Sequence, residues 1–332
     1  MEHNYDFIAI GDITTDAFIR LADPSAHIDI DRGTREICMR FADKIPYEEV
    51  YVVPAVGNSA NAAVSAARLG LKSALVTNLG GDYFGTECLE GLKKDNVSTE
   101  FVAVHKDSKT NYHYVLWFDS DRTILIKHEK FTYNLPDINN PRWVYLSSVG
   151  EGTEEFHAKV EKYLIQHPGI KLAFQPGTFQ IRMGAKAFAG LYKRTDIVIC
   201  NKEESQRILE TKEADIGKLL LAMSELGPKT VVITDGPKGA YAFDGKQAWF
   251  MRAYPDIAQP FERTGAGDAF TSTLVVALAY GLELTEALRW APINSMSVVQ
   301  SVGAQKGLLT RPEIEAYLAK APKDYFPVPL ER

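Results

Sequence analysis

A glycine-rich turn that runs directly into an apolar helix constrains this chain more than any other stretch. Gly265, Ala266 and Gly267 form the turn, and most of the residues from 269 to 280 are apolar. The two glycines permit backbone angles that side chains forbid, and they allow another molecule to approach the main chain closely. Because the first N–H groups of a helix lack internal partners and carry the positive end of its dipole, the turn is suited to bind an anion. Asp268 either stabilises the first helical turn as a carboxylate or acts as a base beside the bound anion, as phosphoryl transfer to a hydroxyl requires.

Length, charge and cysteine content exclude several classes of protein. The chain has 332 residues, of which 24% are charged, and a net charge of −6. No basic block resembles a nucleic-acid footprint. Three widely spaced cysteines (Cys38, Cys88 and Cys200) fit a reducing cytoplasm better than a disulfide framework. Since the N-terminus lacks a signal-peptide pattern and no apolar run approaches the ~18 residues of a membrane span, we expect a cytoplasmic protein without membrane or nucleic-acid partners.

Strands alternate with helices over most of the chain. Buried strands are expected at residues 7–10, 73–76, 143–146, 172–174, 197–200 and 231–234. Helices are expected at 58–69, 88–94, 156–166, 185–192, 203–210, 216–226, 285–300 and 312–319. This rhythm predicts an α/β fold with a central, mostly parallel sheet and helices on both faces.

Two segments interrupt the rhythm with strands of period 2. They predict a small β-sheet lid made of residues 36–53 and 100–128, on a core made of residues 1–35, 54–99 and 129–332. Several apolar residues, including Met39, Phe41, Tyr114 and Trp117, would be exposed on an isolated sheet of this size. They therefore cover a bound substrate, a second subunit or both, and we expect a homodimer formed through the lid.

Polar residues follow the early strands, near the edge of the sheet where α/β proteins bind ligands. Asp16 either caps a turn or binds a ligand. Gly57 and Asn58 open a helix, where they could present polar groups to a ligand or simply cap the helix. Asn61 lies one turn further on and has no capping duty, so it favours ligand binding.

Three later strands end in polar residues that could serve the same site. These are Gln175, the run from Asn201 to Glu204, and the run from Thr234 to Gly236. Asn201 and Glu204 have two interpretations, a helix N-cap with an acidic first turn or a pair facing hydrated Mg²⁺ and phosphate.

Four separated motifs resemble those of the ribokinase-like (PfkB) carbohydrate kinases, which phosphorylate sugars, nucleosides and related alcohols with ATP. They are, in chain order, residues 56–61 (Val-Gly-Asn-Ser-Ala-Asn), 80–85 (Gly-Gly-Asp-Tyr-Phe-Gly), 201–204 (Asn-Lys-Glu-Glu) and 264–268 (Thr-Gly-Ala-Gly-Asp). The two strand insertions fall where that family carries its substrate lid. The resemblance covers residues 5 to 320, and it implies a ribokinase-like fold and an ATP-dependent kinase for a sugar or nucleoside hydroxyl.

The resemblance also implies a role for each candidate residue. Asp268 would accept the proton of the acceptor hydroxyl, and the N–H groups of residues 265–267 would bind the charge on the transferring phosphoryl group. The other candidates fall into three groups: Asp16, Gly57, Asn58 and Asn61 at the acceptor; Asn201, Thr234, Asp235, Gly236, Gly239, Arg263 and Asn294 at the nucleotide; and Glu204, through water, at the metal. ATP and Mg²⁺ are the implied cofactors, and a monovalent cation such as K⁺ is common in the family.

The chain departs from the family pattern at four positions. Val56 replaces a glycine and would narrow the acceptor site, and Gln175 replaces an aspartate common in sugar kinases. Glu262 replaces an aspartate, which leaves cation binding open. Arg263 stands where threonine is more usual, and it either contacts nucleotide phosphates or pairs with a surface acid.

Two other functional classes are excluded because the sequence lacks their nucleotide-binding motifs. The chain has no Gly-x-x-x-x-Gly-Lys-Ser/Thr loop and no Gly-x-Gly-x-x-Gly after its first strand, which excludes P-loop chemistry and a dinucleotide-dependent oxidoreductase. The remaining alternative is a catalytically inactive sensor with the same fold. The intact run at residues 264–268 argues against it.

Overall fold

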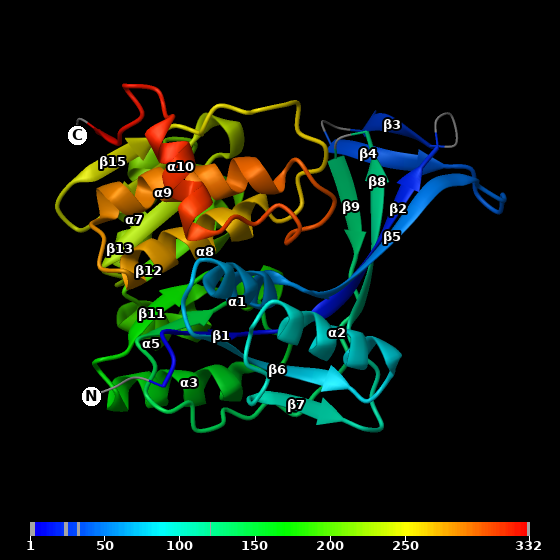
Figure 1. The fold of residues 1–332 in the computed structure, drawn as a ribbon, viewed down its shortest axis with the longest axis horizontal. Helices are drawn as coiled ribbons and strands as arrows, with labels where there is room; N and C mark the ends of the chain where they lie inside the picture. Colours follow the sequence, from blue (N-terminus) through cyan, green and yellow to red (C-terminus); the bar gives the residue numbers. More distant parts are fainter. Residues whose placement is uncertain (1–3, 23–25, 32–33, 120, 331–332) are drawn as a thin grey trace.

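A large sheet forms the main body of the protein, and a smaller sheet stands beside it (Figure 1). The structure, a computed structural model, describes residues 4–22, 26–31, 34–119 and 121–330. In spatial order the large sheet contains β16 (Val328–Pro329), β15 (Ala248–Met251), β14 (Ala240–Phe243), β13 (Thr230–Thr234), β12 (Ile197–Asn201), β11 (Lys171–Phe174), β10 (Trp143–Leu146), β1 (Phe7–Ile10), β6 (Ser73–Gly80) and β7 (Val102–His105). Neighbours from β13 to β7 pair in parallel, and β14 to β16 pair antiparallel.

Helices bury both faces of the large sheet, because alternate residues of its strands enter two separate cores. On β1, Phe7 and Ala9 belong to one core, and Ile8 and Ile10 to the other. The first core is covered by α1 (Asn58–Arg68), α2 (Tyr83–Lys94), α8 (Ala266–Ala279), α9 (Leu284–Val298) and α10 (Arg311–Ala319). The second is covered by α3 (Glu154–Gln166), α4 (Thr178–Met183), α5 (Ala189–Arg194), α6 (Lys202–Ile208) and α7 (Ile216–Glu225). The predicted fold class is confirmed.

Two short 3₁₀ helices complete the described elements of the main body. They are η1 (Ala185–Phe188), which breaks the helix expected at 185–192, and η2 (Gly236–Lys238). Within the described ranges, no helix is both long enough and apolar enough to span a bilayer.

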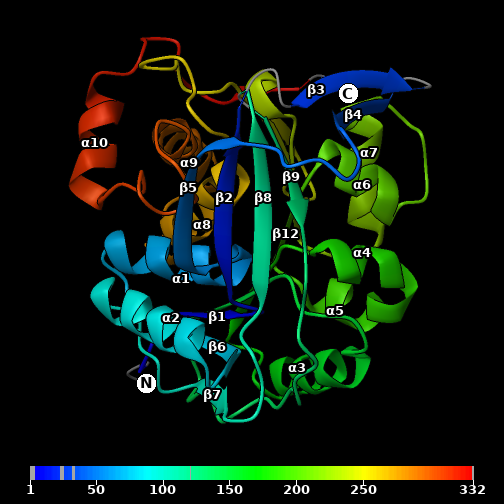
Figure 2. The ribbon, with the colours of Figure 1, turned by 90° about the vertical axis from the view of Figure 1, so that its right-hand side faces the viewer.

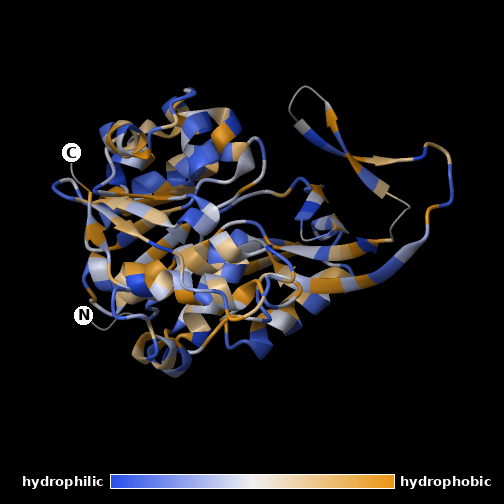
Figure 3. Ribbon diagram, turned by 90° about the horizontal axis from the view of Figure 1, so that it is seen from above, coloured by the Kyte–Doolittle hydropathy of each residue, from blue (hydrophilic) through white to orange (hydrophobic). Residues whose placement is uncertain are grey.

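The small sheet contains four strands in the order β5 (Tyr47–Val56), β2 (Thr14–Leu21), β8 (Tyr112–Phe118) and β9 (Asp121–Leu125) (Figure 2). A separate ribbon of β3 (Ala26–Asp31) and β4 (Thr34–Met39) projects away from the main body (Figure 3). We call the four-stranded sheet the lid sheet.

Three strands lie in sheets that the sequence did not predict. Residues 14–21, expected in the core, form the second strand of the lid sheet, so Asp16 lies on a strand and not in a turn. Residues 102–105, expected in the lid, pair with β6 at the edge of the large sheet. The strand expected at 37–41 ends at Met39 and pairs with β3 instead of joining the lid sheet. Period 2 reveals that a segment is extended, but not which edge it pairs with.

The two faces of the lid sheet differ in exposure to solvent. Trp117 was expected to be exposed, but it lies on the buried inner face. Val50, Val52, Tyr114 and Leu125 share the outer face and are about half exposed, as the pairing of β5, β2, β8 and β9 dictates. Trp117 is only 2% exposed because it points inward, toward the main body. Alternation along β8 accounts for the difference, since residues three apart on a strand face opposite ways.

Candidate active site

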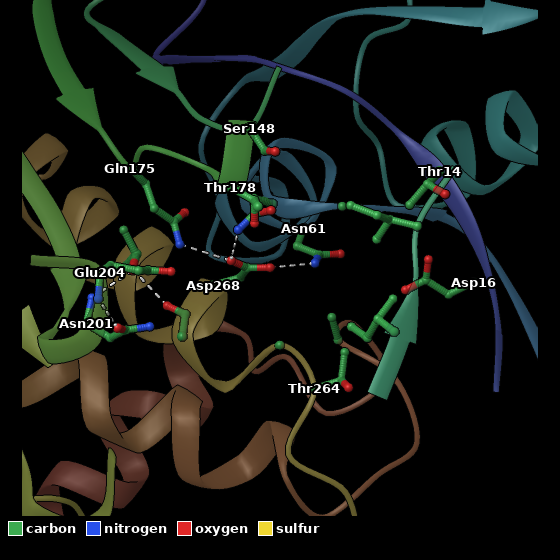
Figure 4. A pocket seen from close by; sticks show the side chains of 18 of the residues that line it. Thr14, Asp16, Asn61, Ser148, Gln175, Thr178, Asn201, Glu204, Thr264 and Asp268 are labelled. Atoms are coloured by element: carbon green, nitrogen blue, oxygen red, sulfur yellow. Dashed lines mark hydrogen bonds between the residues drawn. The ribbon is translucent and has the colours of Figure 1, made fainter. Parts of the chain in front are cut away.

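A cavity of about 390 Å³ lies where the carboxyl ends of the main-sheet strands meet the lid sheet. It gathers predicted residues that are far apart in the sequence (Figure 4). Those that line it are Asp16, Gly57, Asn58, Asn61, Asn201, Glu204, Thr234, Arg263, Gly265, Gly267 and Asp268. Gln175 also lines it.

A second cavity of about 470 Å³ adjoins the first at the glycine turn. Thr234, Arg263 and Gly267 line both cavities. The rest of the second cavity is lined mainly by glycines, prolines and apolar side chains. They include Gly236, Pro237, Gly239, Ala266, Tyr254, Phe270, Pro292 and Met296. The turn at 265–267 therefore stands between two compartments.

The geometry of the turn explains its two glycines. Gly265 has φ +82°, in the left-handed region, and a Cβ there would lie 2.4 Å from the Cα of Ala304. A Cβ on Gly267 would meet no protein atom within 4 Å. The first glycine is thus required by the protein's own packing, whereas the second leaves open the space between the two cavities.

Asp268 lies in the first turn of α8, where three amide side chains hold its carboxylate (Figure 4). Its Oδ1 accepts hydrogen bonds from Asn58 Nδ2 at 2.9 Å and Gln175 Nε2 at 3.1 Å, and its Oδ2 accepts one from Asn61 Nδ2 at 2.8 Å. Burial raises the pKa of Asp268, while the hydrogen bonds from Asn61, Gln175 and Asn58 lower it. The carboxylate is consequently fixed in orientation and points into the first cavity.

Gln175 takes part in this arrangement through both ends of its amide. The hydroxyl of Tyr145 donates to its Oε1, which directs its Nε2 toward Asp268. The sequence marked Gln175 as a departure from the family pattern, and the structure shows that the amide provides a donor to the aspartate.

Asn201 and Glu204 cap α6 reciprocally. Asn201 Oδ1 accepts from the Glu204 N–H at 2.7 Å, and Glu204 Oε2 accepts from the Asn201 N–H at 2.8 Å. Both residues also line the first cavity, and burial raises the pKa of Glu204. The capping interpretation is confirmed, and the cap places a carboxylate beside the glycine turn.

Two carboxylate–imidazole pairs form a wall on the lid side of the first cavity, and of their four residues the sequence analysis identified only Asp16. Asp16 Oδ1 lies 3.3 Å from His113 Nδ1 without the alignment of a hydrogen bond, and His128 Nδ1 lies 2.8 Å from Asp12 Oδ2. The two imidazole rings are neighbours, with centroids 5.3 Å apart. In the described part of the chain, Asp16 Oδ1 and His113 Nε2 are buried without a hydrogen-bond partner. This wall can still accept and donate hydrogen bonds.

Three residues highlighted by the sequence are not among those that line either cavity. Asn294 is fully buried, where its Nδ2 donates to Thr273 Oγ1 at 2.8 Å and its Oδ1 accepts from the Leu309 N–H at 2.9 Å. Both ends of the amide are therefore engaged within the protein, and the nucleotide-binding role of Asn294 stays a prediction. Asp235 precedes η2 and pairs with Lys238, and Val56 is buried.

Glu262 and Arg263, the unusual residues before the turn, have different environments. Glu262 is fully buried, and its Oε1 accepts hydrogen bonds from the N–H and hydroxyl of Thr264 at 2.7 and 2.6 Å. Arg263 is exposed, borders both cavities and forms no ion pair with any residue that the structure describes. Its position thus favours contact with a ligand over pairing with a surface acid.

Comparison with known proteins agrees with this geometry. The model of the family described as "pfkB family carbohydrate kinase" matches residues 25–311. The chain belongs to the pfkB family. This pfkB-family chain is 30% identical to ribokinase from Bacillus subtilis over 272 residues, which is 79% of this chain and 87% of the relative. It is 26% identical to a nucleoside kinase from Methanothermobacter thermautotrophicus over 260 residues, which is 76% of this chain and 80% of that protein.

Solved structures share the architecture of this pfkB-family chain. The Arabidopsis thaliana ribokinase complexed with ribose and ATP superposes with a TM-score of 0.79 and 21% identity, and the match covers 95% of this chain and 98% of that one. At this identity the likeness establishes the fold.

Proposed function

We propose that this protein transfers the γ-phosphoryl group of ATP to a hydroxyl of a sugar or nucleoside. The observation that carries the proposal is the position of Asp268, which three amides hold in the first cavity where it adjoins the second. Relatives of this chain include a ribokinase and a nucleoside kinase, which supports this choice of acceptors.

The acceptor is proposed to occupy the first cavity, beneath the lid sheet. Asp16, Gly57, Asn58 and Asn61 line this side and would bind or surround its hydroxyls. Asp268 takes the proton of the reacting hydroxyl as that oxygen forms a bond to the γ-phosphorus. The bond from the γ-phosphorus to the bridging oxygen breaks at the same centre, and ADP leaves with that electron pair.

The nucleotide is proposed to occupy the second cavity, with its phosphates directed at the glycine turn. The apolar side chains Tyr254, Phe270 and Met296 suit a base, and Thr234, Gly236 and Gly239 offer polar groups and close backbone approach. The N–H groups of residues 265–267 and the guanidinium of Arg263 face the charge of the transferring group.

Asn201 and Glu204 are proposed to hold Mg²⁺ through water beside the phosphates. Their fit rests on Glu204, which lines the first cavity. Burial raises the pKa of its carboxyl group, and a cation in the cavity would offset the cost of ionising that group. When bound, Mg²⁺ neutralises phosphate charge. A monovalent cation is a separate proposal, for which the buried Glu262 Oε2, without a hydrogen-bond partner in the described residues, offers a ligand atom.

The test is ADP formation on a panel of sugars and nucleosides, with Mg²⁺ and ATP. We expect ADP formation that depends on one acceptor class. Clear binding of an acceptor without turnover would overturn the kinase and favour a sensor with the same fold.

We further propose that the lid sheet closes over the acceptor and joins two subunits. The outer face carries Val50, Val52, Tyr114 and Leu125, an apolar surface of the kind that a second subunit covers. A homodimer by light scattering at micromolar concentration is the expected result, and a monomer would contradict it.

A further inference from the structure

The hairpin of β8 and β9 touches the main body at two consecutive residues just before the glycine turn. Trp117 and Arg122 are directly opposite each other across this hairpin. The ring of Trp117 packs edge-on against Phe261, with centroids 5.2 Å apart. Arg122 Nε lies 3.8 Å from Glu262 Oε1. One cross-strand pair of the lid sheet thus meets one dipeptide of the catalytic loop.

The contact continues into the turn through Glu262. The same oxygen that faces Arg122 accepts both hydrogen bonds from Thr264, the residue that precedes Gly265. Glu262 is fully buried, and an ionised carboxylate in that environment requires an opposing charge. Among the described residues, Arg122 is the cation that pairs with it.

The cavity side of β9 connects this contact to the acceptor. Arg122 and Ile124 are two residues apart on β9, so their side chains share one face, and both line the first cavity. Arg122 Nε is buried without a hydrogen-bond partner in the described structure, and the other ion pair of the side chain is with its exposed neighbour Asp121, at 3.8 Å. A molecule bound against Ile124 therefore bears on the strand that carries Arg122.

We propose that Arg122 and Trp117 are positioning residues, through which the lid hairpin sets the conformation of the glycine turn at 264–267. The turn has the conformation needed for transfer when the hairpin packs against Phe261 and Glu262. An acceptor bound in the first cavity stabilises this packing. The catalytic consequence of this inference rests on the proposed kinase function. Phosphoryl transfer would then require a bound acceptor, and transfer of the γ-phosphoryl group to water would be restricted.

A double-mutant cycle tests the coupling in turnover. Arg122→Gln is expected to lower kcat about 10- to 100-fold, because a turn displaced by a fraction of an ångström no longer matches the transition state, with the KM for ATP nearly unchanged. Glu262→Gln and the double variant are expected to show non-additivity, the double losing much less than the product of the single losses. Arg122→Lys should recover part of kcat. The matched control is Arg40→Gln, since Arg40 is an exposed arginine of the lid region that pairs with Asp43 and should leave kcat unaltered.

Hydrogen exchange measured by mass spectrometry provides a readout that needs no turnover. Peptides spanning residues 262–272 should exchange several-fold faster in Arg122→Gln than in the wild type or Arg40→Gln, at unchanged melting temperature. Unaltered exchange together with additive kinetics would overturn the coupling and leave the kinase proposal intact. Faster local exchange in a protein that turns over no acceptor would support the coupling and overturn the kinase proposal.

Discussion

Two sides of the first cavity differ in how completely their polar groups are hydrogen-bonded. We call Asp268 and the amides that hold it the floor, and the carboxylates and imidazoles on the lid side the lid wall. On the floor, both oxygens of Asp268 accept hydrogen bonds from amides of the main body. On the lid wall, Asp16 Oδ1 and His113 Nε2 are buried without a hydrogen-bond partner among the described residues. A buried polar atom in that condition costs about 1–3 kcal/mol, which a ligand can offset. The comparison indicates a base positioned before any ligand binds, facing a wall that an acceptor completes.

The largest effect should follow a change to the floor. Asp268→Asn is expected to lower kcat by roughly 10²–10⁴, because the side chain can no longer take the proton of the acceptor hydroxyl. Titration calorimetry should show nucleotide affinity close to that of the wild type. A variant with full turnover would remove Asp268 from the role of base.

Changes to the lid wall should act on acceptor binding. Asp16→Asn and His113→Gln are each expected to raise the acceptor KM about 10- to 100-fold with a smaller change in kcat, since they disturb the groups that an acceptor would satisfy. Asp29→Asn, on the exposed ribbon strand β3, is the control and should leave KM as it is. If kcat fell instead and KM stayed constant, the division between floor and wall would be wrong.

The amides of the floor should control the pH profile. Asn61→Ala removes a hydrogen bond that lowers the pKa of Asp268. That pKa should rise, so the unprotonated base forms only at higher pH and the acid limb of kcat should shift to higher pH. Asn78→Ala, which removes a buried amide bonded to His105 instead, serves as the control. An unmoved or downward-shifted limb in Asn61→Ala would contradict the preorganised floor.

Asn294 should affect stability without affecting catalysis. Asn294→Ala leaves the buried N–H of Leu309 without its acceptor and is expected to lower the free energy of unfolding by about 1–3 kcal/mol. Chemical denaturation measures this, and kcat and both KM values should stay at the wild-type level. A selective rise in the KM for ATP would support the nucleotide-binding role that the sequence predicted.

The sequence predicted the floor better than the wall because the floor is encoded by local motifs. Each of residues 57–61, 201–204 and 264–268 couples a turn to the start of a helix, and parallel strands bring such starts to one edge of a sheet. Gly265 needs its left-handed backbone for the turn itself, so its signal is present in a few neighbouring letters. The fold class followed from the same alternation of strands and helices.

The wall depends on pairings between distant strands, which no local pattern specifies. Asp16 and His113 face each other only because β2 and β8 pair in parallel in one register. The same uncertainty placed β7 in the wrong sheet and made Trp117 an exposed residue. Arg122 lies in a strand of mixed polarity, where nothing in the sequence links it to Glu262, 140 residues later.

Transfer of a labelled phosphoryl group tests the account most directly. The protein is incubated with ATP labelled at the γ-phosphorus, Mg²⁺ and the acceptor found by the panel, and the products are separated. The account predicts that the label appears on the acceptor with the wild type and is strongly reduced with Asp268→Asn. Label recovered only as inorganic phosphate, or the same yield of phosphorylated acceptor from both proteins, would contradict it.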